Sequence, residues 1–128
     1  MPDKTILESK NAPAAVGPYS MGVKIGNTIF LSGQLGLDPS TGDFVSDSIE
    51  DQTRQSLSNL ENVLRSNSMD LNNVVKTTVF LKDIGDFQKM NAVYSEFFRD
   101  KFPARSTVAV AALPKNGKVE IEAIAYSN

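Results

Sequence analysis

Apolar side chains recur at helical spacing in two stretches of the chain. The first stretch begins at Ser48, which can cap a helix together with Asp51 three residues later. Its predicted inner positions are Ile49, Thr53, Leu57, Leu60 and Leu64, and its predicted outer positions include Glu50, Gln52, Arg54, Asn59 and Glu61. The second stretch begins near Asp86 and must end before Pro103. Its inner stripe comprises Phe87, Met90, Tyr94, Phe97 and Phe98. Both patterns predict amphipathic helices that lie on a flat surface.

Five shorter segments have the composition and spacing of strands. They are residues 19–25, 28–32, 74–81, 106–112 and 119–126. Gly26-Asn27 is a favoured hairpin turn between the first two strands, and Gly33 begins the loop that ends the second. Asn116-Gly117 predicts another hairpin between the last two strands. The order is two strands, a helix, a strand, a helix and two strands, which predicts an α+β fold.

Both helix crossovers are expected to be right-handed and to pack on one face of a mixed sheet. The opposite face would then carry exposed Ile, Val and Ala side chains. Because large exposed apolar surfaces usually mark interfaces, we expect another copy of the chain to cover this face. The length of 128 residues suits a single domain that spans residues 1–128.

Composition and charge exclude several kinds of chemistry. The chain has no Cys and no His, so it has no disulfide, thiol nucleophile, imidazole base, or thiolate or imidazole metal ligand. Its net charge of −2 argues against nucleic acid as the main partner. No apolar run is long enough to cross a bilayer. The first residues resemble neither a secretory signal nor a transit peptide, so the cytoplasm is the expected location.

Two charged positions are candidates for chemistry. Arg105 follows a proline-constrained approach to a strand, where a guanidinium can bind a carboxylate through two parallel hydrogen bonds. The alternative for Arg105 is a surface ion pair. Glu120 and Glu122 share one strand face with Ile124 and Tyr126, and apolar neighbours raise the pKa of a carboxyl group toward values useful for a general base. The alternative for this acidic pair is an edge strand kept soluble by its charges.

Three uncharged polar residues are weaker candidates. Asn91 falls on the helix face predicted to be buried, where its amide could brace a turn or orient a site. Tyr19 and Ser32 flank the first hairpin, where their hydroxyls could meet a small ligand or belong to the core or a turn.

Five motifs, in order, resemble the Rid family, the YjgF-like reactive intermediate (imine) deaminases. The motifs are Gly17-Pro18-Tyr19, Leu31-Ser32-Gly33-Gln34, Val75-Lys76-Thr77-Thr78-Val79-Phe80-Leu81, Phe102-Pro103-Ala104-Arg105-Ser106 and Val119-Glu120-Ile121-Glu122-Ala123-Ile124-Ala125. The resemblance runs from about residue 11 to residue 126. It implies a chorismate-mutase-like fold, assembled as a homotrimer with active sites in the clefts between subunits.

The resemblance also implies roles for individual residues. Arg105 would bind the substrate carboxylate, and Glu120 would handle the attacking water. Tyr19, Ser32 and Asn91 would complete the substrate site.

One position departs from the family pattern. Thr107 stands two residues after the arginine, where many members carry Cys, and it would line the same substrate site. If this position acts through its backbone, activity should survive the exchange. If the thiol itself contributes to the pocket, substrate preference should differ.

The reaction that the resemblance implies is hydrolysis of short 2-imino acids, such as 2-iminobutanoate and 2-iminopropanoate, to 2-oxo acids and ammonia. A protonated imine is already electrophilic, so we expect no metal and no cofactor. The alternative is a non-enzymatic trimeric binding protein, either an RNA-directed translation inhibitor or a chaperone-like factor.

Overall fold

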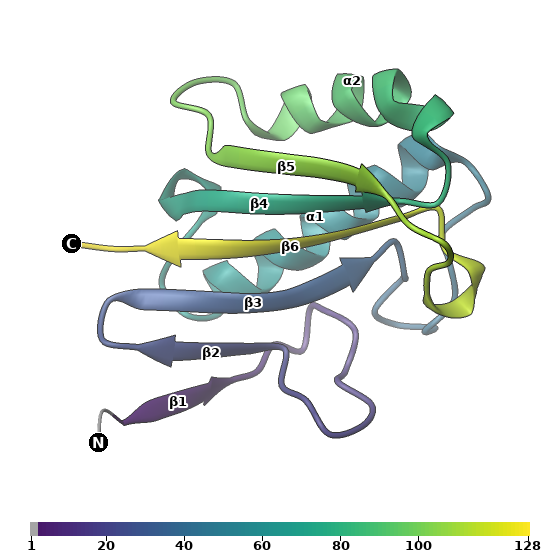
Figure 1. Cartoon of the computed structure of the whole chain (residues 1–128). Coiled ribbons are helices and arrows are strands. Elements are labelled where there is room, and N and C mark those ends of the chain that lie inside the picture. Colours follow the sequence, from purple (N-terminus) through teal and green to yellow (C-terminus); the bar gives the residue numbers. More distant parts are fainter. Residues whose placement is uncertain (1–2) are drawn as a thin grey trace.

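Six strands form one sheet in the computed structural model, which describes residues 3–128 (Figure 1). The strands are β1 (Lys4–Leu7), β2 (Gly22–Ile25), β3 (Thr28–Leu35), β4 (Val74–Leu81), β5 (Ala104–Ala109) and β6 (Val119–Tyr126). The two α-helices are α1 (Ile49–Arg65) and α2 (Phe87–Phe97). Three short 3-10 helices join them, at Leu71–Asn73, Ile84–Asp86 and Pro114–Asn116. The predicted α+β class is confirmed.

The sheet is mixed, with the strand order β1-β2-β3-β6-β4-β5. Only β4 and β5 pair in parallel, and every other neighbouring pair is antiparallel. Because β6 lies antiparallel between β3 and β4, those two strands run in the same direction. Each α-helix therefore connects two strands of the same direction, and α1 lies behind the sheet in the view of Figure 1.

The core lies between the helices and one face of the sheet. In β6 the buried positions alternate with more exposed ones, so that Val119, Ile121, Ala123 and Ala125 face the helices. The helices meet them with the predicted inner residues, among which Ile49, Thr53, Leu57, Leu60, Leu64, Met90 and Tyr94 are buried. The apolar stripes predicted for both helices are thus confirmed.

Two residues predicted on outer faces of α1 are buried instead. Asn59 is fully buried, and its amide donates to the carbonyl oxygens of Leu35 and Leu37 at 3.2 and 3.0 Å. Gln52 is 2% exposed and accepts a hydrogen bond from the backbone of Lys118 at 2.9 Å. These backbone groups lie at or just beyond the ends of β3 and β6, and the two side-chain amides supply hydrogen-bond partners for them. The positions of polar residues along the sequence do not show which backbone groups their side chains will bind.

The predicted hairpin between the last two strands is wrong. β5 and β6 are not neighbours, because β4 lies between them. The segment between β5 and β6 returns along the end of β4, with hydrogen bonds from Val110 N to Leu81 O at 2.9 Å and from Lys82 N to Lys118 O at 3.0 Å. Long-range pairing of β6 on both of its edges outweighs the local preference of the Asn-Gly turn.

The remaining differences concern strand ends. The first hairpin is confirmed at its predicted turn, but β2 begins at Gly22 instead of Tyr19. β3 continues past Gly33 to Leu35, and β5 covers Ala104–Ala109 instead of residues 106–112. The strand β1 was not expected, and it pairs antiparallel with β2 at the edge of the sheet.

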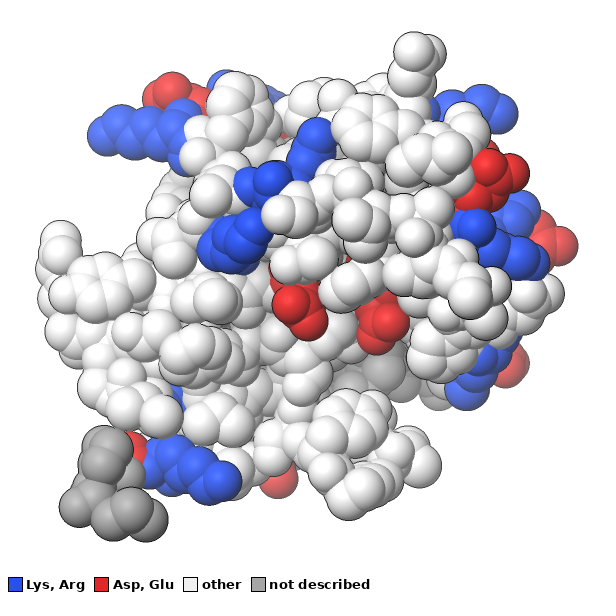
Figure 2. All heavy atoms as spheres, viewed as in Figure 1, with Lys and Arg blue, Asp and Glu red and all other residues white. Residues whose placement is uncertain are grey.

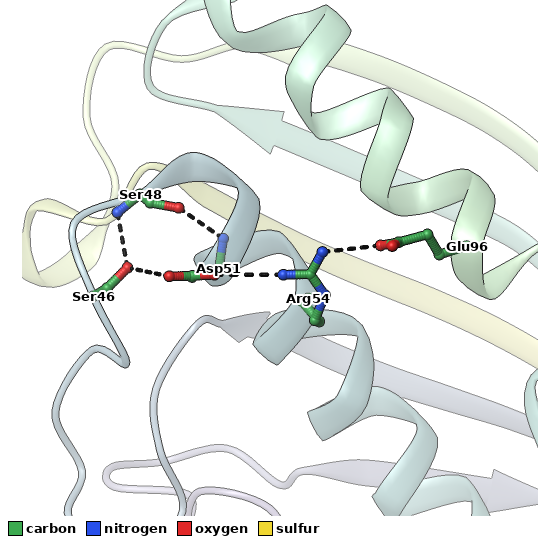
Figure 3. Close-up of polar contacts among 5 residues, drawn as sticks. All are labelled: Ser46, Ser48, Asp51, Arg54 and Glu96. Carbon is green, nitrogen blue, oxygen red and sulfur yellow. Dashed lines mark hydrogen bonds and ion pairs between the residues drawn. The ribbon is translucent and has the colours of Figure 1, made fainter.

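Polar contacts at the start of α1 connect it to α2 (Figure 3). Ser48 caps the helix by accepting a hydrogen bond from Asp51 N at 3.0 Å, as predicted. Ser46 bridges the two residues, since its hydroxyl accepts from Ser48 N at 3.0 Å and donates to the Asp51 carboxylate at 2.8 Å. Arg54 then pairs with Asp51 at 3.4 Å and with Glu96 of α2 at 3.0 Å. Because these ion pairs are exposed to solvent, they contribute little to the stability of the fold.

The sheet face opposite the helices is uncovered, as predicted. Its exposed apolar side chains are Ile6, Ile25, Phe30, Val108 and Tyr126, each between 38% and 50% exposed. Figure 2 shows this face, where uncharged atoms dominate and a small acidic group lies near the centre. Among residues 3–128, no helix has the length and apolarity needed to cross a membrane.

Replacing Asn59 tests the buried amide. We expect Asn59→Leu to lower the free energy of unfolding by about 2–4 kcal/mol, because two half-buried carbonyl oxygens lose their donor. Ser58→Ala, at the neighbouring half-buried position, should stay within about 0.5 kcal/mol of the wild type. Urea unfolding at one fixed protein concentration measures both variants. Equal stability of Asn59→Leu and the wild type would contradict the assigned role.

Candidate active site

The guanidinium of Arg105 lies on the helix side of the sheet, against α2. Its strand partner Thr77 in β4 is fully buried on the same side. Arg105 Nη1 donates a hydrogen bond to Asn91 Oδ1 at 2.7 Å. The guanidinium carbon lies 4.7 Å from the ring centroid of Tyr94 and 5.6 Å from that of Phe87, which are cation–π distances.

The three α2 residues that hold the arginine form one row on the helix. Phe87, Asn91 and Tyr94 stand at positions i, i+4 and i+7. Phe87 and Tyr94 were predicted only as core residues. Their spacing on either side of Asn91 is the sequence signal that could have indicated a common contact with Arg105. Asn91 itself is exposed, which corrects the prediction that it faces the core. It lies beyond the buried stripe, over the sheet edge, where it meets Arg105.

Arg105 takes part in none of the ion pairs among residues 3–128. The arginines in those pairs are Arg54 and Arg65, both of α1. The surface ion-pair alternative for Arg105 is therefore wrong within one chain. Its guanidinium has five N–H donors, and only one is used by Asn91. The remaining donors can bind an anion in the bidentate geometry of a carboxylate.

A buried hydroxyl pair lies beneath the guanidinium. Tyr94 Oη and Thr77 Oγ1 are 2.8 Å apart, and both residues are at least 95% buried. Burial raises the pKa of Tyr94, while the hydrogen bond to Thr77 and the positive charge of Arg105 act in the opposite direction. The phenol is thus neutral at physiological pH.

Glu120 lies on the other face of the sheet, above a glycine of β3. A Cβ atom at Gly33 would stand 2.5 Å from Glu120 Oε2 and 2.9 Å from its Cγ, so any other residue at this position would displace the carboxylate. The pairing of β3 with β6 is irregular at this place, between Leu31 and Gln34. Glycine and bulge together make the space that Glu120 occupies.

The surroundings of Glu120 favour its protonated form. Partial burial raises the pKa of this carboxyl group, and the negative charge of Glu122 raises it further. Glu122 is exposed on the same face of β6. A carboxylate with a raised pKa is a better proton acceptor for water than an ordinary surface glutamate.

Ser32 adjoins Gly33, the glycine beneath Glu120, whereas Tyr19 lines a separate cavity. Ser32 Oγ donates to the carbonyl oxygen of Ser20 at 2.5 Å, which ties the segment before β2 to β3. Tyr19 is 55% exposed and lines a cavity of about 750 Å³ with Ser20 and residues 6–11. Neither Arg105 nor Glu120 lines this cavity.

One chain does not bring Arg105 and Glu120 together. Arg105 points to the helix side, and Glu120 points to the open side. The register places their backbones two strands and three residues apart, roughly 10 Å across the sheet and roughly 10 Å along it. Thr107 shares the side of Arg105, and its hydroxyl is buried without a hydrogen-bond partner among residues 3–128.

Comparison with known proteins matches the chain to the family described as Endoribonuclease L-PSP over residues 9–127. It is 52% identical to "Reactive Intermediate Deaminase A, chloroplastic" of Arabidopsis thaliana, covering 95% of this chain and 65% of the plant protein. It is 48% identical to "2-iminobutanoate/2-iminopropanoate deaminase" of Bos taurus, covering 95% of this chain and 89% of the bovine protein.

Solved structures agree with these sequence matches. The structure of the YjgF gene product from E. coli superimposes with a TM-score of 0.93 at 46% identity, covering 97% of this chain and 99% of that one. The chain therefore belongs to the Rid family of reactive intermediate deaminases, and the resemblance noted in its motifs is confirmed.

The effect of the Glu122 charge on the pKa of Glu120 can be tested directly. We expect Glu122→Gln to lower the pKa of Glu120, because the like charge beside it is removed while its burial stays the same. Glu122→Asp keeps the charge and should leave more of the shift in place. Carboxyl ¹³C NMR titration measures the pKa of Glu120 in each variant. An unchanged or higher pKa in Glu122→Gln would show that Glu122 does not act on Glu120.

Proposed function

We propose that the chain is a 2-iminobutanoate/2-iminopropanoate deaminase, which hydrolyses short 2-imino acids to 2-oxo acids and ammonia. The observation that carries the proposal is the guanidinium of Arg105, which Asn91 and two aromatic rings hold in place and which has no carboxylate partner in the described part of the chain, residues 3–128. The bovine relative that bears the name of this activity supports the substrate class. The plant relative is named as chloroplastic, and a cytoplasmic location for this chain stays a prediction.

The proposed active site needs two copies of the chain. One wall would carry the Arg105 group, and the other wall would carry the Glu120 group of a neighbouring copy. The first group comprises Asn91, Arg105 and Thr107, and the second comprises Tyr19, Ser32 and Glu120. A chorismate-mutase-like homotrimer would also cover the apolar sheet face, which supports this assembly.

Arg105 and Glu120 divide the reaction between them. Arg105 binds the substrate carboxylate through two parallel hydrogen bonds, which holds the adjacent imine carbon at one place. Glu120 accepts a proton from water while the water oxygen attacks that carbon and the C=N electrons move to nitrogen. The product of this step is a carbinolamine and a protonated Glu120.

The same carboxyl group can complete the reaction. Glu120 returns its proton to the amine nitrogen, and the C–N bond breaks to release ammonia. As the C=O bond forms, the Glu120 carboxylate takes the hydroxyl proton and passes it to the released ammonia. The net change converts the iminium and water to the 2-oxo acid and ammonium. No metal or cofactor is needed for this balance, since the protonated imine is itself the electrophile.

Three hydroxyl groups would shape the pocket around these steps. Tyr19 and Ser32 would stand on the Glu120 side, and Thr107 would stand on the Arg105 side, where its hydroxyl has no hydrogen-bond partner among residues 3–128. A ligand in the cleft can supply that partner. Thr107 would therefore favour substrates with a hydrogen-bonding group at this place, which a Cys would serve less well.

RNA cleavage or RNA binding is the second candidate, favoured by the description of the family as Endoribonuclease L-PSP. The net charge of −2 and the acidic pair at Glu120 and Glu122 disfavour a polyanion on the open face. RNA affinity that falls steeply with added salt, without turnover of imines, would favour this candidate over the deaminase.

Replacing Arg105 by lysine separates charge from geometry. We expect Arg105→Lys to lower kcat/KM for imine hydrolysis at least ~10²-fold, because the ammonium cannot form the two-pronged contact. Arg99→Lys makes the same exchange at an exposed arginine beyond α2 and should retain wild-type activity. Ammonia release from imines generated by a threonine dehydratase measures both. Near-normal turnover by Arg105→Lys would contradict the proposal.

Mixing two inactive variants tests the shared site. We expect Arg105→Lys and Glu120→Gln to be nearly inactive alone, and chains refolded together to regain up to about one quarter of the wild-type sites. The gain arises because some interfaces combine an intact Arg105 with an intact Glu120. Light scattering should give three times the chain mass. A mixture no more active than its two components would show that each site lies within one chain.

A further inference from the structure

The contact between Arg105 and Tyr94 is one link in a longer series of contacts. Thr77 lies in β4, which pairs with a strand on each side, and its hydroxyl meets that of Tyr94 at 2.8 Å. The Tyr94 ring is 5% exposed and lies beneath the guanidinium. Phe98 packs against Tyr94, with the ring centroids 4.7 Å apart and the planes at 35°. The core of the sheet is thereby connected to the guanidinium.

We propose that Tyr94 is a positioning residue for Arg105, and that Thr77 anchors the Tyr94 ring for this purpose. The inference rests on the proposed function, because it assigns the guanidinium to a substrate carboxylate. Tyr94 acts through the arginine and does not touch the substrate.

An anchor is needed because Arg105 stands on an edge strand. Within residues 3–128, β5 has a neighbouring strand on one side only, and the Arg105 side chain has several rotatable bonds and no carboxylate partner. Binding an anion with a freely rotating guanidinium would require ordering of that side chain at each encounter. Asn91 fixes one nitrogen, and the rings of Tyr94 and Phe87 limit the tilt of the plane.

The hydroxyl group of Tyr94 explains why a tyrosine, and not a phenylalanine, is expected beneath Arg105. The oxygen lies on the long axis of the ring, so its hydrogen bond to Thr77 fixes the direction of that axis. Packing against Phe98 limits rotation about the axis. A ring held in both respects presents a defined face to the guanidinium. The expected benefit is selective binding of a planar carboxylate over a neutral group of the same shape.

Paired ligands separate positioning from packing. 2-Oxobutanoate carries the carboxylate that Arg105 would bind, and 2-oxobutanamide has the same shape without the charge. Calorimetry gives the affinity of each variant for both ligands, and ammonia release gives kcat and KM for imines. We expect Tyr94→Leu to weaken binding of 2-oxobutanoate by roughly 3- to 30-fold, the range of a lost cation–π contact, and to leave the amide unchanged. KM should rise more than kcat falls.

Two volume-conserving variants test the anchor. Tyr94→Phe and Thr77→Val each remove one half of the hydroxyl pair, and each should weaken 2-oxobutanoate binding by less than about 5-fold. The double variant should be no weaker than either single one, because both remove the same interaction. Additive losses would overturn the role of Thr77.

A matched control removes an aromatic residue of α2 outside this series of contacts. Phe97→Leu loses packing against the core without loss of a side chain that holds Tyr94 or Arg105, and it should keep at least half of the acid-over-amide selectivity. An equal loss in Phe97→Leu and Tyr94→Leu, or an equal loss for acid and amide, would overturn the inference. Failure of the deaminase proposal gives a different result: the wild type would release no ammonia from imines, whatever the variants bind.

Discussion

The insertion of β6 between β3 and β4 is the constraint on which the rest of the structure depends. Because β6 pairs on both edges, its alternating side chains are divided strictly between two faces. Its small and branched residues face α1 and α2 and complete the core. The acidic residues of the same strand are thereby placed on the open face, where Glu120 fills the space above Gly33.

The position of β5 follows from the same arrangement. With both edges of β6 occupied, β5 pairs with the far edge of β4 and forms one end of the sheet. Arg105 thus stands at an edge, where α2 extends over it and supplies an amide and two rings from one row of residues. An arginine in the centre of the sheet would have required a buried counter-charge. At the edge it stays charged and available to an anion.

The side chains of Arg105 and Glu120 in one chain face opposite directions, and the proposed shared site would explain why an apolar sheet face accompanies them. The open face of the sheet carries apolar residues together with Glu120, so a copy that covers the apolar residues also comes close to the carboxylate. Assembly and completion of the proposed site would then be one event.

The sequence by itself determined both helices, the first hairpin, three further strand positions in outline and the polar residues of the proposed site. Periodicity carries this information because the core side of each element must be apolar. Only the tertiary structure decided which strands are neighbours, that Asn59 and Gln52 are buried, and that Asn91 is exposed beside Arg105. These features depend on partners distant along the chain: a carbonyl group or a strand edge that needs a hydrogen bond leaves no local mark in the sequence.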